Sequence, residues 1–297
     1  MTSDKILLSN QIIYQLSPVH KPCRRVNLGQ EFVVNSPNSF GGKINSKFIF
    51  QQLVTNPTQR KHPVIGPFFV NGVRKGEAIS VNIKDIQLTS DYYQCVSFSS
   101  GVIPKFGDDR NYQIFPKKPD IKISGFTIKV NPSVGFLAAT PSKNISCGRA
   151  GIFGGNLDIP DIKVTTKVHL PVLLPGGLIV VGDVHAIQGE GEISGTGAEV
   201  SAKIKLKIDK SPFMIQYPVI ETATDFLVVG TGKYLNKAIQ NAVLNSLSFL
   251  KNFSSSSRSH LYLALGLAGN ISLGNSTGYI KTAAVKISKA IWTQKIY

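Results

Sequence analysis

Apolar and polar residues alternate with a period of two along several short segments, and this pattern most limits what the chain can fold into. The alternating segments are residues 31–34 (EFVV), 78–88 (AISVNIKDIQL), 120–130 (DIKISGFTIKV) and 200–208 (VSAKIKLKI). Successive side chains of a strand point to opposite faces of a sheet, so each segment predicts a strand with one buried face. Turn-forming pairs such as Asn71-Gly72 and Gly176-Gly177 separate the segments. Many short strands joined by turns favour a mainly β fold, either a β-sandwich or a barrel.

The last quarter of the chain has a helical period instead. Between residues 233 and 253 apolar residues such as Leu235 and Ala238 recur at steps of three and four, which predicts an amphipathic helix. Residues 259–269 can form a second short helix, and residues 279–288 a final strand. We therefore expect two parts: a β-rich body, residues 1–215, and a smaller α+β part, residues 216–297, packed on it.

Cellular location is indicated by what the first residues and the apolar runs lack. No run of about 18 apolar residues occurs, and the N-terminal sequence MTSDKILLSNQIIYQL lacks a long apolar core with a cleavage site. The three cysteines, Cys23, Cys95 and Cys147, are too few and too scattered for a disulfide framework. We expect a cytoplasmic protein with no membrane partner.

The formal net charge of +16 raises the question of an anionic partner. Basic residues are spread as singles and pairs, such as Arg24-Arg25 and Lys117-Lys118, without a dense tract or interleaved aromatic residues. A nucleic-acid binder concentrates its charge on one face, so we expect no specific nucleic-acid partner. Binding to an anionic polymer stays open as a weaker alternative that rests on charge alone.

Residues 178–200 (LIVVGDVHAIQGEGEISGTGAEV) are the segment richest in chemistry. An apolar strand leads directly into Asp183 and His185, which share a face on an extended backbone, and Glu190 and Glu192 are expected to share one likewise. An imidazole nitrogen with carboxylate oxygens suits a divalent metal ion that keeps one position open for water. The alternative is a solvated loop whose histidine makes an ordinary hydrogen bond.

A second group of donors lies upstream. The sequence GGNLD at 154–158 places Asn156 and Asp158 two residues apart beside a flexible glycine pair. An amide and a carboxylate at this spacing can contribute to the same site, either as ligands or as partners of ligands.

Three stretches of the chain resemble the acetamidase/formamidase family. They are residues 66–86 (GPFFVNGVRKGEAISVNIKDI), the GGNLD element, and residues 169–199, which are similar to the family's long signature ending Gly-Asp-x-His-x-x-Gln-Gly-Asp-Gly-Glu and a closing Glu. Order and spacing agree from about residue 11 to residue 288. The resemblance implies hydrolysis of a small amide, of the formamide or acetamide type, to a carboxylate and ammonia by metal-activated water. It also implies a homo-oligomer, with a dimer favoured and Trp292 near a candidate contact surface.

The resemblance also suggests a role for each candidate residue. We expect Asp158, Asp183 and His185 to hold a divalent ion, with zinc the expected metal. Glu190 or Glu192 would take the proton of the attacking water and pass it to the departing nitrogen. Asn156 and Gln188, which are neutral amides, would orient the substrate or stabilise the developing oxyanion.

Three positions depart from the family pattern and keep another function open. Asn38 stands where an aspartate is usual, Phe153 where many members have histidine, and Glu190 where aspartate is commoner. These changes leave a catalytically degenerate relative, which binds a metal or a ligand, as the alternative function.

Two further residues have local settings that suggest a role in the site. Cys147 could be a nucleophile paired with His185, although the resemblance favours hydrolysis through metal-bound water. His62 precedes Gly66-Pro67 and could approach the pocket, although a structural role is the simpler interpretation.

Overall fold

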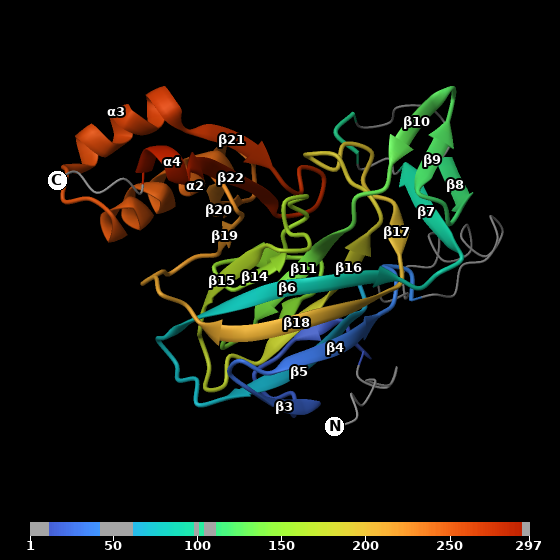
Figure 1. The fold of residues 1–297 in the computed structure, drawn as a ribbon, viewed down its shortest axis with the longest axis horizontal. Helices are drawn as coiled ribbons and strands as arrows, with labels where there is room; N and C mark the ends of the chain where they lie inside the picture. The colour runs from blue at the N-terminus through green and yellow to red at the C-terminus, as the bar shows by residue number, and fades with distance from the viewer. Residues whose placement is uncertain (1–11, 42–61, 98–100, 104–110, 293–297) are drawn as a thin grey trace.

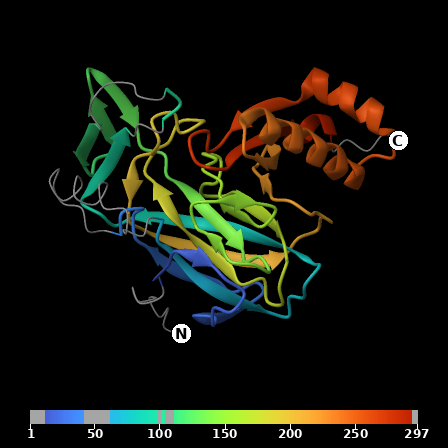
Figure 2. The same ribbon diagram turned by 180° about the vertical axis from the view of Figure 1, so that it is seen from behind.

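The structure, a computed structural model, describes residues 12–41, 62–97, 101–103 and 111–292. In these residues strands dominate and most of them belong to two large sheets, which form the body of the molecule (Figure 1). The helices gather at one end of the body, and the strands β7 to β10 lie at the opposite end, as the view from behind also shows (Figure 2). The predicted mainly β fold with a C-terminal helical part is confirmed.

The first sheet carries most of the candidate site. Its main path is β13 (Ala150–Gly151), β14 (Gly154–Asn156), β11 (Ser133–Ala139), β16 (Ile179–His185), β17 (Glu199–Val200), β7 (Tyr92–Ser97) and β8 (Asn111–Pro116). β5 (Val64–Asn71) also pairs with β16, and β1 (Ile12–Ile13) and β3 (Arg24–Asn27) pair with β5. β16 is therefore a central strand, and every residue from Ile179 to His185 is buried. Burial on both faces explains why its apolar run Ile179–Val181 does not alternate.

The second sheet runs through both predicted parts of the chain. Its order is β21 (Asn270–Leu273), β22 (Lys281–Ser288), β20 (Asp225–Gly232), β19 (Val219–Glu221), β15 (Lys167–Pro171), β6 (Ala78–Leu88), β18 (Ala202–Lys210) and β4 (Glu31–Ser36). The alternation predicted from the sequence is clearest in β18, where Ile204, Leu206 and Ile208 are buried and the intervening lysines are not. These apolar side chains pack between the sheets.

One hydrophobic core joins the two sheets. Val81 and Leu206 from the second sheet belong to the same buried cluster as Phe68 and Val181 from the first. Each of these side chains is fully buried, and burying such a side chain contributes about 2–3 kcal/mol relative to leaving it exposed. The core therefore fixes the position of β16, the strand from which the site is built.

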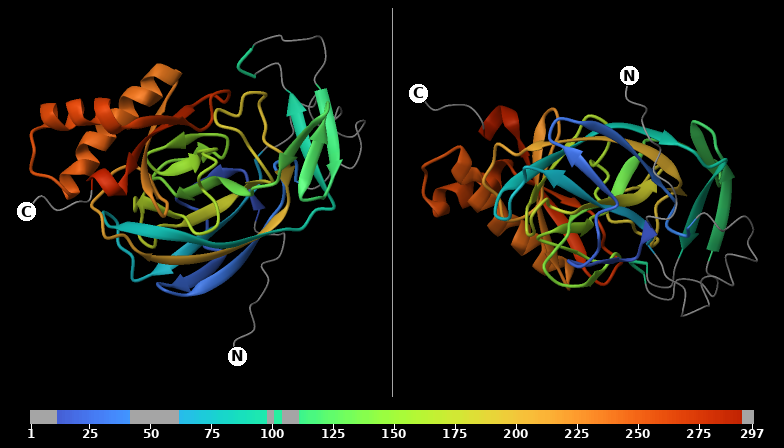
Figure 3. Two further views of the ribbon diagram at one scale, coloured as in Figure 1. Left: turned by 45° about the horizontal axis from the view of Figure 1, so that its top comes forward. Right: turned by 90° about the horizontal axis from the view of Figure 1, so that it is seen from below.

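The C-terminal elements confirm the predicted helical pattern. They are α2 (Leu235–Phe249), the 3-10 turn η2 (Leu250–Asn252), α3 (Arg258–Ala268) and α4 (Lys289–Trp292). α2 lies against β20 and β22 (Figure 3). A Cβ atom at Gly230 of β20 would stand 2.1 Å from the backbone nitrogen of Ala242, so glycine is what permits this close packing. A separate cluster of aromatic rings, Phe213, Phe226, Phe249 and Phe253, holds the helix to the sheet.

Residues 120–130 differ from the single strand that their alternation predicts. They form a hairpin of β9 (Asp120–Ile123) and β10 (Phe126–Lys129), with Ser124 and Gly125 at positive φ in the turn. Glycine tolerates this backbone conformation, which suits a two-residue turn. The two strands pair without a break from Phe126 and Ile123 to Lys129 and Asp120. The remaining short pair is β2 (Gln15–Leu16) with β12 (Ile145–Ser146).

The boundary between the two predicted parts is crossed by the second sheet, because β15 pairs with β19. The division into residues 1–215 and 216–297 stays a prediction about domains. In the described part of the chain, no helix is long and apolar enough to cross a membrane.

Candidate active site

The register between two strands brings the central pair of side chains together. β16 carries Asp183 and His185, and β17 pairs with it so that Glu199 stands directly opposite His185. Side chains directly opposite on neighbouring strands lie on the same face of the sheet. The Nε2 atom of His185 is therefore 3.1 Å from Oε1 of Glu199.

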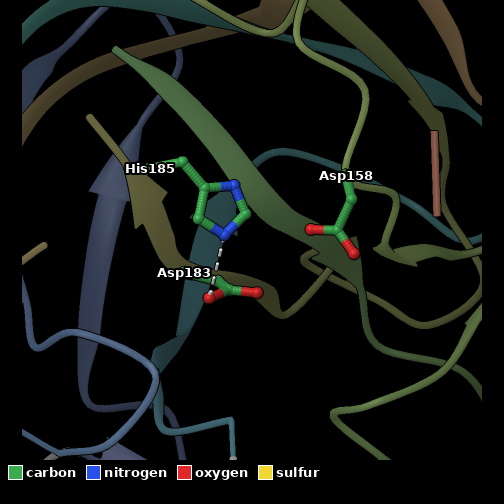
Figure 4. A group of neighbouring side chains, drawn as sticks. All are labelled: Asp158, Asp183 and His185. Atoms are coloured by element: carbon green, nitrogen blue, oxygen red, sulfur yellow. Dashed lines mark ion pairs between the residues drawn. The ribbon is translucent and has the colours of Figure 1, made fainter. Parts of the chain in front are cut away.

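Two loops add further carboxylates to the same point. Asp158 follows β14, and Glu192 lies in the connection between β16 and β17. Nε2 of His185 is 3.7 Å from Oδ1 of Asp183 and 4.0 Å from Oε1 of Glu192. Figure 4 shows Asp158 and Asp183 approaching the imidazole ring from different sides. None of these four carboxylates, with Glu199 included, is more than 7% exposed.

These residues form two overlapping groups with the chemistry of a metal site. One consists of Asp158, Asp183 and His185, and the other of His185, Glu192 and Glu199; in each, the donor atoms lie within 4.8 Å of one another. Oδ1 of Asp158 and both ring nitrogens of His185 are buried and form no hydrogen bond with a described residue. The short contact from Nε2 to Glu199 is thus an ion-pair contact without hydrogen-bond geometry. Buried donors without partners are what a cation site requires.

The concentrated negative charge changes the protonation of the cluster. Burial, reinforced by the Asp183 carboxylate, raises the pKa of Asp158 to about 7. Burial and the Asp158 carboxylate raise the pKa of Glu192 well above its ordinary value, and burial likewise raises that of Glu199. Burial disfavours the imidazolium form of His185, but the Glu199, Asp183 and Glu192 carboxylates outweigh it and raise the pKa of the imidazole. The imidazolium of His185 supplies one positive charge to four carboxylates, so a bound cation would stabilise their ionised forms.

Polar side chains from distant parts of the chain hold the carboxylates in place. Ser39, which follows β4, donates to Oε2 of Glu199 at 2.7 Å and also contacts Asp183. Asn275, between β21 and β22, donates to Oδ2 of Asp158 at 2.7 Å and to Oε2 of Glu192 at 3.3 Å. Neither residue was singled out in the sequence, because no local pattern connects positions so far apart.

A small polar cavity opens onto the cluster. Its volume is about 200 Å³, and Ser39, Asp158, Asp183, Glu192, Glu199 and Asn275 are among the residues that line it. Gly135 lies behind the site: a Cβ atom there would stand 2.5 Å from Oδ1 of Asp158. The backbone of β11 thus approaches the carboxylates closely because residue 135 has no side chain.

The two amide residues predicted to contact the substrate lie at different places. Asn156 lines the cavity, and its Nδ2 donates to Oδ2 of Asp158. Gln188 is buried but is not among the residues that line the cavity, and its Nε2 donates to the main-chain oxygen of Asp158 at 2.6 Å. Gln188 therefore fixes the loop that presents Asp158.

The two candidate acid–base residues, Glu190 and Glu192, also lie at different places. The chain turns at Glu190-Gly191, and Gly191 and Glu192 both have positive φ, so the expected extended alternation does not occur. Glu192 is buried, and its Oε1 accepts a hydrogen bond from the backbone N–H of Gly197 at 3.1 Å. Glu190 is exposed and accepts from Oγ of Ser272 at 2.9 Å, outside the cluster.

The residues that depart from the family pattern do not line this cavity. Asn38 donates to Oε1 of Gln94 at 2.8 Å, and its Oδ1 accepts from the backbone N–H of Phe40 at 3.1 Å, which shapes the turn that presents Ser39. Phe153 is buried in a hydrophobic cluster with Phe136 and Val180. Cys147 is also fully buried, and burial raises the pKa of its thiol to about 12, which disfavours a thiolate nucleophile.

The fold and the site together define a class of protein: a two-sheet β protein with a buried cluster of one histidine and several carboxylates at the base of a small polar cavity. The model of the acetamidase/formamidase family matches residues 16–146 and 138–273, and the chain belongs to this family of amidases.

Individual relatives agree with this membership. A formamidase of Methylophilus methylotrophus is 30% identical over 122 residues, which are 34% of this chain and 30% of that protein. In each curated relative that matches, the aligned part is less than a third of the relative's length. The crystal structure of an acetamidase from Bacillus halodurans superposes with a TM-score of 0.90 at 26% identity, covering 97% of this chain and 98% of that one. A predicted acetamidase/formamidase from Thermoanaerobacter tengcongensis gives 0.88 at 26% identity, with 95% and 94% covered.

Proposed function

We propose that this protein hydrolyses a small linear amide, of the formamide or acetamide type, to a carboxylate and ammonia in the cavity above His185. The observation that carries the proposal is the buried cluster of four carboxylates around one imidazole, with unpaired donor atoms at the base of a cavity. A volume of about 200 Å³ suits a substrate of a few heavy atoms, with room for one or two waters. Family membership supports the reaction class.

The donor set fits a divalent cation. Asp158, Asp183 and His185 would hold it, with zinc our first candidate because zinc binds both imidazole nitrogen and carboxylate oxygen. Such an ion, when bound, supplies a water of lowered pKa and polarises the amide carbonyl. Glu199 approaches the same Nε2 atom of His185 from the opposite strand, so it would be a further carboxylate donor to the ion.

In this proposal Glu192, and not Glu190, accepts the proton of the attacking water. Glu192 lines the cavity, and hydrogen bonds from Gly197 and Asn275 fix its two carboxylate oxygens. A base whose pKa is raised by burial can hold the proton after the water attacks and release it later in the cycle. Asn156, which lines the cavity beside Asp158, is placed to orient the amide group.

The alternative of a degenerate relative was motivated by Asn38 and Phe153. Both side chains lie outside the set that lines the cavity, so neither removes a group from the site. A cytoplasmic location, self-association as a dimer and the absence of a nucleic-acid partner remain parts of the proposal. The side chain of Trp292, the candidate oligomer contact, lies outside the described residues.

Metal content and ammonia release together test the proposed function. The purified wild type should retain a divalent metal by mass spectrometry and release ammonia from formamide or acetamide. His185→Ala should lose both properties, because two carboxylates without the imidazole hold zinc far less well. His260→Ala, at an exposed histidine of α3, is the matched control and should match the wild type. A wild type with neither metal nor ammonia release would refute the proposal.

A further inference from the structure

One histidine, His62, is among the residues that line the cavity. His62 lies two residues before β5, at the edge of the segment that the structure describes, and lines the cavity together with Asp183, Glu192 and Asn156. Two histidines thus belong to this region, but only His185 lies within ion-pair distance of a described carboxylate. The carboxylates surround His185, and His62 is a separate group at the wall.

One ring nitrogen of His62 lacks a partner among the described residues. Its Nδ1 is buried and forms no hydrogen bond with any of them. An unsatisfied buried polar atom destabilises a fold, so a protein seldom keeps one without a reason. His62 also has a φ of 59°, a conformation that is uncommon for residues other than glycine. Strained and unsatisfied residues of this kind cluster at functional sites.

The ring of His62 lies against a glycine of the cavity wall, Gly148. A Cβ atom at Gly148, another lining residue, would stand 3.2 Å from Cδ2 and 3.4 Å from Nε2 of His62. The Cδ2–Nε2 edge of the imidazole therefore lies against a residue without a side chain. His62 and Gly148 thus meet at the wall of the cavity.

From this geometry we propose that His62 is a catalytic residue that contacts the amide nitrogen and protonates it as ammonia leaves. The proposal rests on amide hydrolysis at this cavity as the proposed function. It assigns the two proton transfers to two different groups, with Glu192 acting on the water and His62 on the leaving nitrogen. Ammonia requires such a proton, because an amide anion is too basic to leave, and histidine is the commonest general acid near neutral pH.

In the proposed reaction Glu192 and His62 each transfer one proton, and solvent restores both groups. One proton of water moves to the carboxylate of Glu192 while the water oxygen bonds to the amide carbon. The imidazolium of His62 then gives its N–H proton to the amide nitrogen. The C–N bond of the substrate breaks, and the electron pair of that bond stays on the amide nitrogen. Glu192 releases its proton and His62 takes one up, both through solvent. The sum is one amide and one water converted to one carboxylic acid and one ammonia.

The leaving group distinguishes a catalytic role from a structural one. His62→Gln should lower kcat for formamide by about 100-fold or more, the usual contribution of a positioned general acid, and change KM only a few-fold. The same variant should lose at most about tenfold on trifluoroethyl formate, whose alcohol leaves with little help from an acid. Metal content should equal that of the wild type. His260→Gln, the same change at an exposed histidine, should leave all three values unaltered.

A second variant displaces the ring without removing it. Gly148→Ala adds one methyl group against His62 and should give a kcat for formamide between those of the wild type and His62→Gln. Gly189→Ala, where a Cβ would meet nothing within 4 Å, is its matched control and should retain full kcat. A His62→Gln enzyme within twofold of the wild type on formamide, or equally impaired on amide and ester, overturns the proposal.

Nitrogen NMR of the imidazole side chains gives a readout that does not depend on turnover. Signals missing from His62→Gln identify His62, and saturating acetamide should shift them in wild-type protein whose metal has been removed by chelation. If the wild type releases no ammonia from either amide, amide hydrolysis is refuted as the function. The spectrum then tests by itself whether the imidazole of His62 contacts an amide. No shift on adding acetamide would then show that His62 does not contact the amide.

Discussion

Glu190 and Glu192 are separated by one glycine, yet only the second faces the cavity. Glu192→Gln should lower kcat for formamide by at least about 100-fold, because the glutamine keeps the shape of the side chain but cannot accept the water's proton. Glu190→Gln is the control: among the described residues this exposed side chain bonds to Ser272 and Leu273 of β21, outside the cavity, and kcat should stay within about threefold of the wild type. Ammonia release, with metal content measured in parallel, checks both variants. Equal losses in the two would contradict the assignment.

The sequence predicted part of this site, and local spacing explains which part. Asp183 and His185 were found together because they lie two residues apart on one strand, and Asp158 because it follows a glycine pair. Glu199 received no role, since its contact with His185 depends on the pairing of β16 with β17. Ser39 and Asn275 lie in loops that adjoin strands of the other sheet, so only the tertiary structure shows their part in the site.

At the scale of elements, the contact between α2 and β20 depends on one glycine. Gly230→Ala would place a Cβ atom 2.1 Å from a backbone nitrogen of α2, so helix or strand must move, and we expect a loss of about 2 kcal/mol or more in stability. Gly266→Ala in α3 is the matched change, because a Cβ there meets nothing within 4 Å. Alanine should stabilise that helix by about 0.5–1 kcal/mol. Urea unfolding of both variants tests this, and a Gly230→Ala protein as stable as the wild type would refute the packing argument.

Element types followed from periodicity, but strand ends and partners did not. The helix α2 and the strands β6 and β18 agree with their predicted segments because each has one buried face. Residues 120–130 were predicted as one strand, since alternation continues through the turn of the hairpin and only Ser124-Gly125 interrupts it. In the second sheet β4 pairs with β18, although the two strands are far apart in sequence. No local sequence pattern encodes that pairing.

At the scale of the whole molecule, a partly buried network of polar contacts links β15, β19 and α4. Glu221 receives a hydrogen bond from Lys289 at 2.8 Å and lies 3.1 Å from Nε2 of His169. The contact with His169, followed by that with Lys289, lowers the pKa of Glu221 to about 2 from an ordinary value of 4.5. A carboxyl group with a lowered pKa stabilises the fold above its unfolded pKa, so this contribution is present above about pH 4.5 and is lost as pH falls toward 2. Glu221 is only partly buried, so solvent screens its contacts and the stabilisation is about 1–2 kcal/mol.

Glu221→Gln tests this linkage. The variant should be less stable than the wild type at pH 7, and the gap between the two should shrink as the pH is lowered to 3. Glu31→Gln removes a carboxylate whose ion pairs with Lys84 and Lys205 are at the surface, and it should change stability by less than about 1 kcal/mol. Urea midpoints at both pH values provide the measurement. A constant gap between Glu221→Gln and the wild type would show that titration of Glu221 is not involved.

Residues that line the cavity are drawn from positions 39 to 278, and this spread has a consequence for biosynthesis. A ribosome adds residues in order, and Asn275 emerges only after nearly every other lining residue has left the exit tunnel. Until then Asp158 and Glu192 lack the amide that donates hydrogen bonds to both. A nascent chain that has already paired β16 with β17 therefore holds an incomplete site until Asn275 has been synthesised and has left the tunnel.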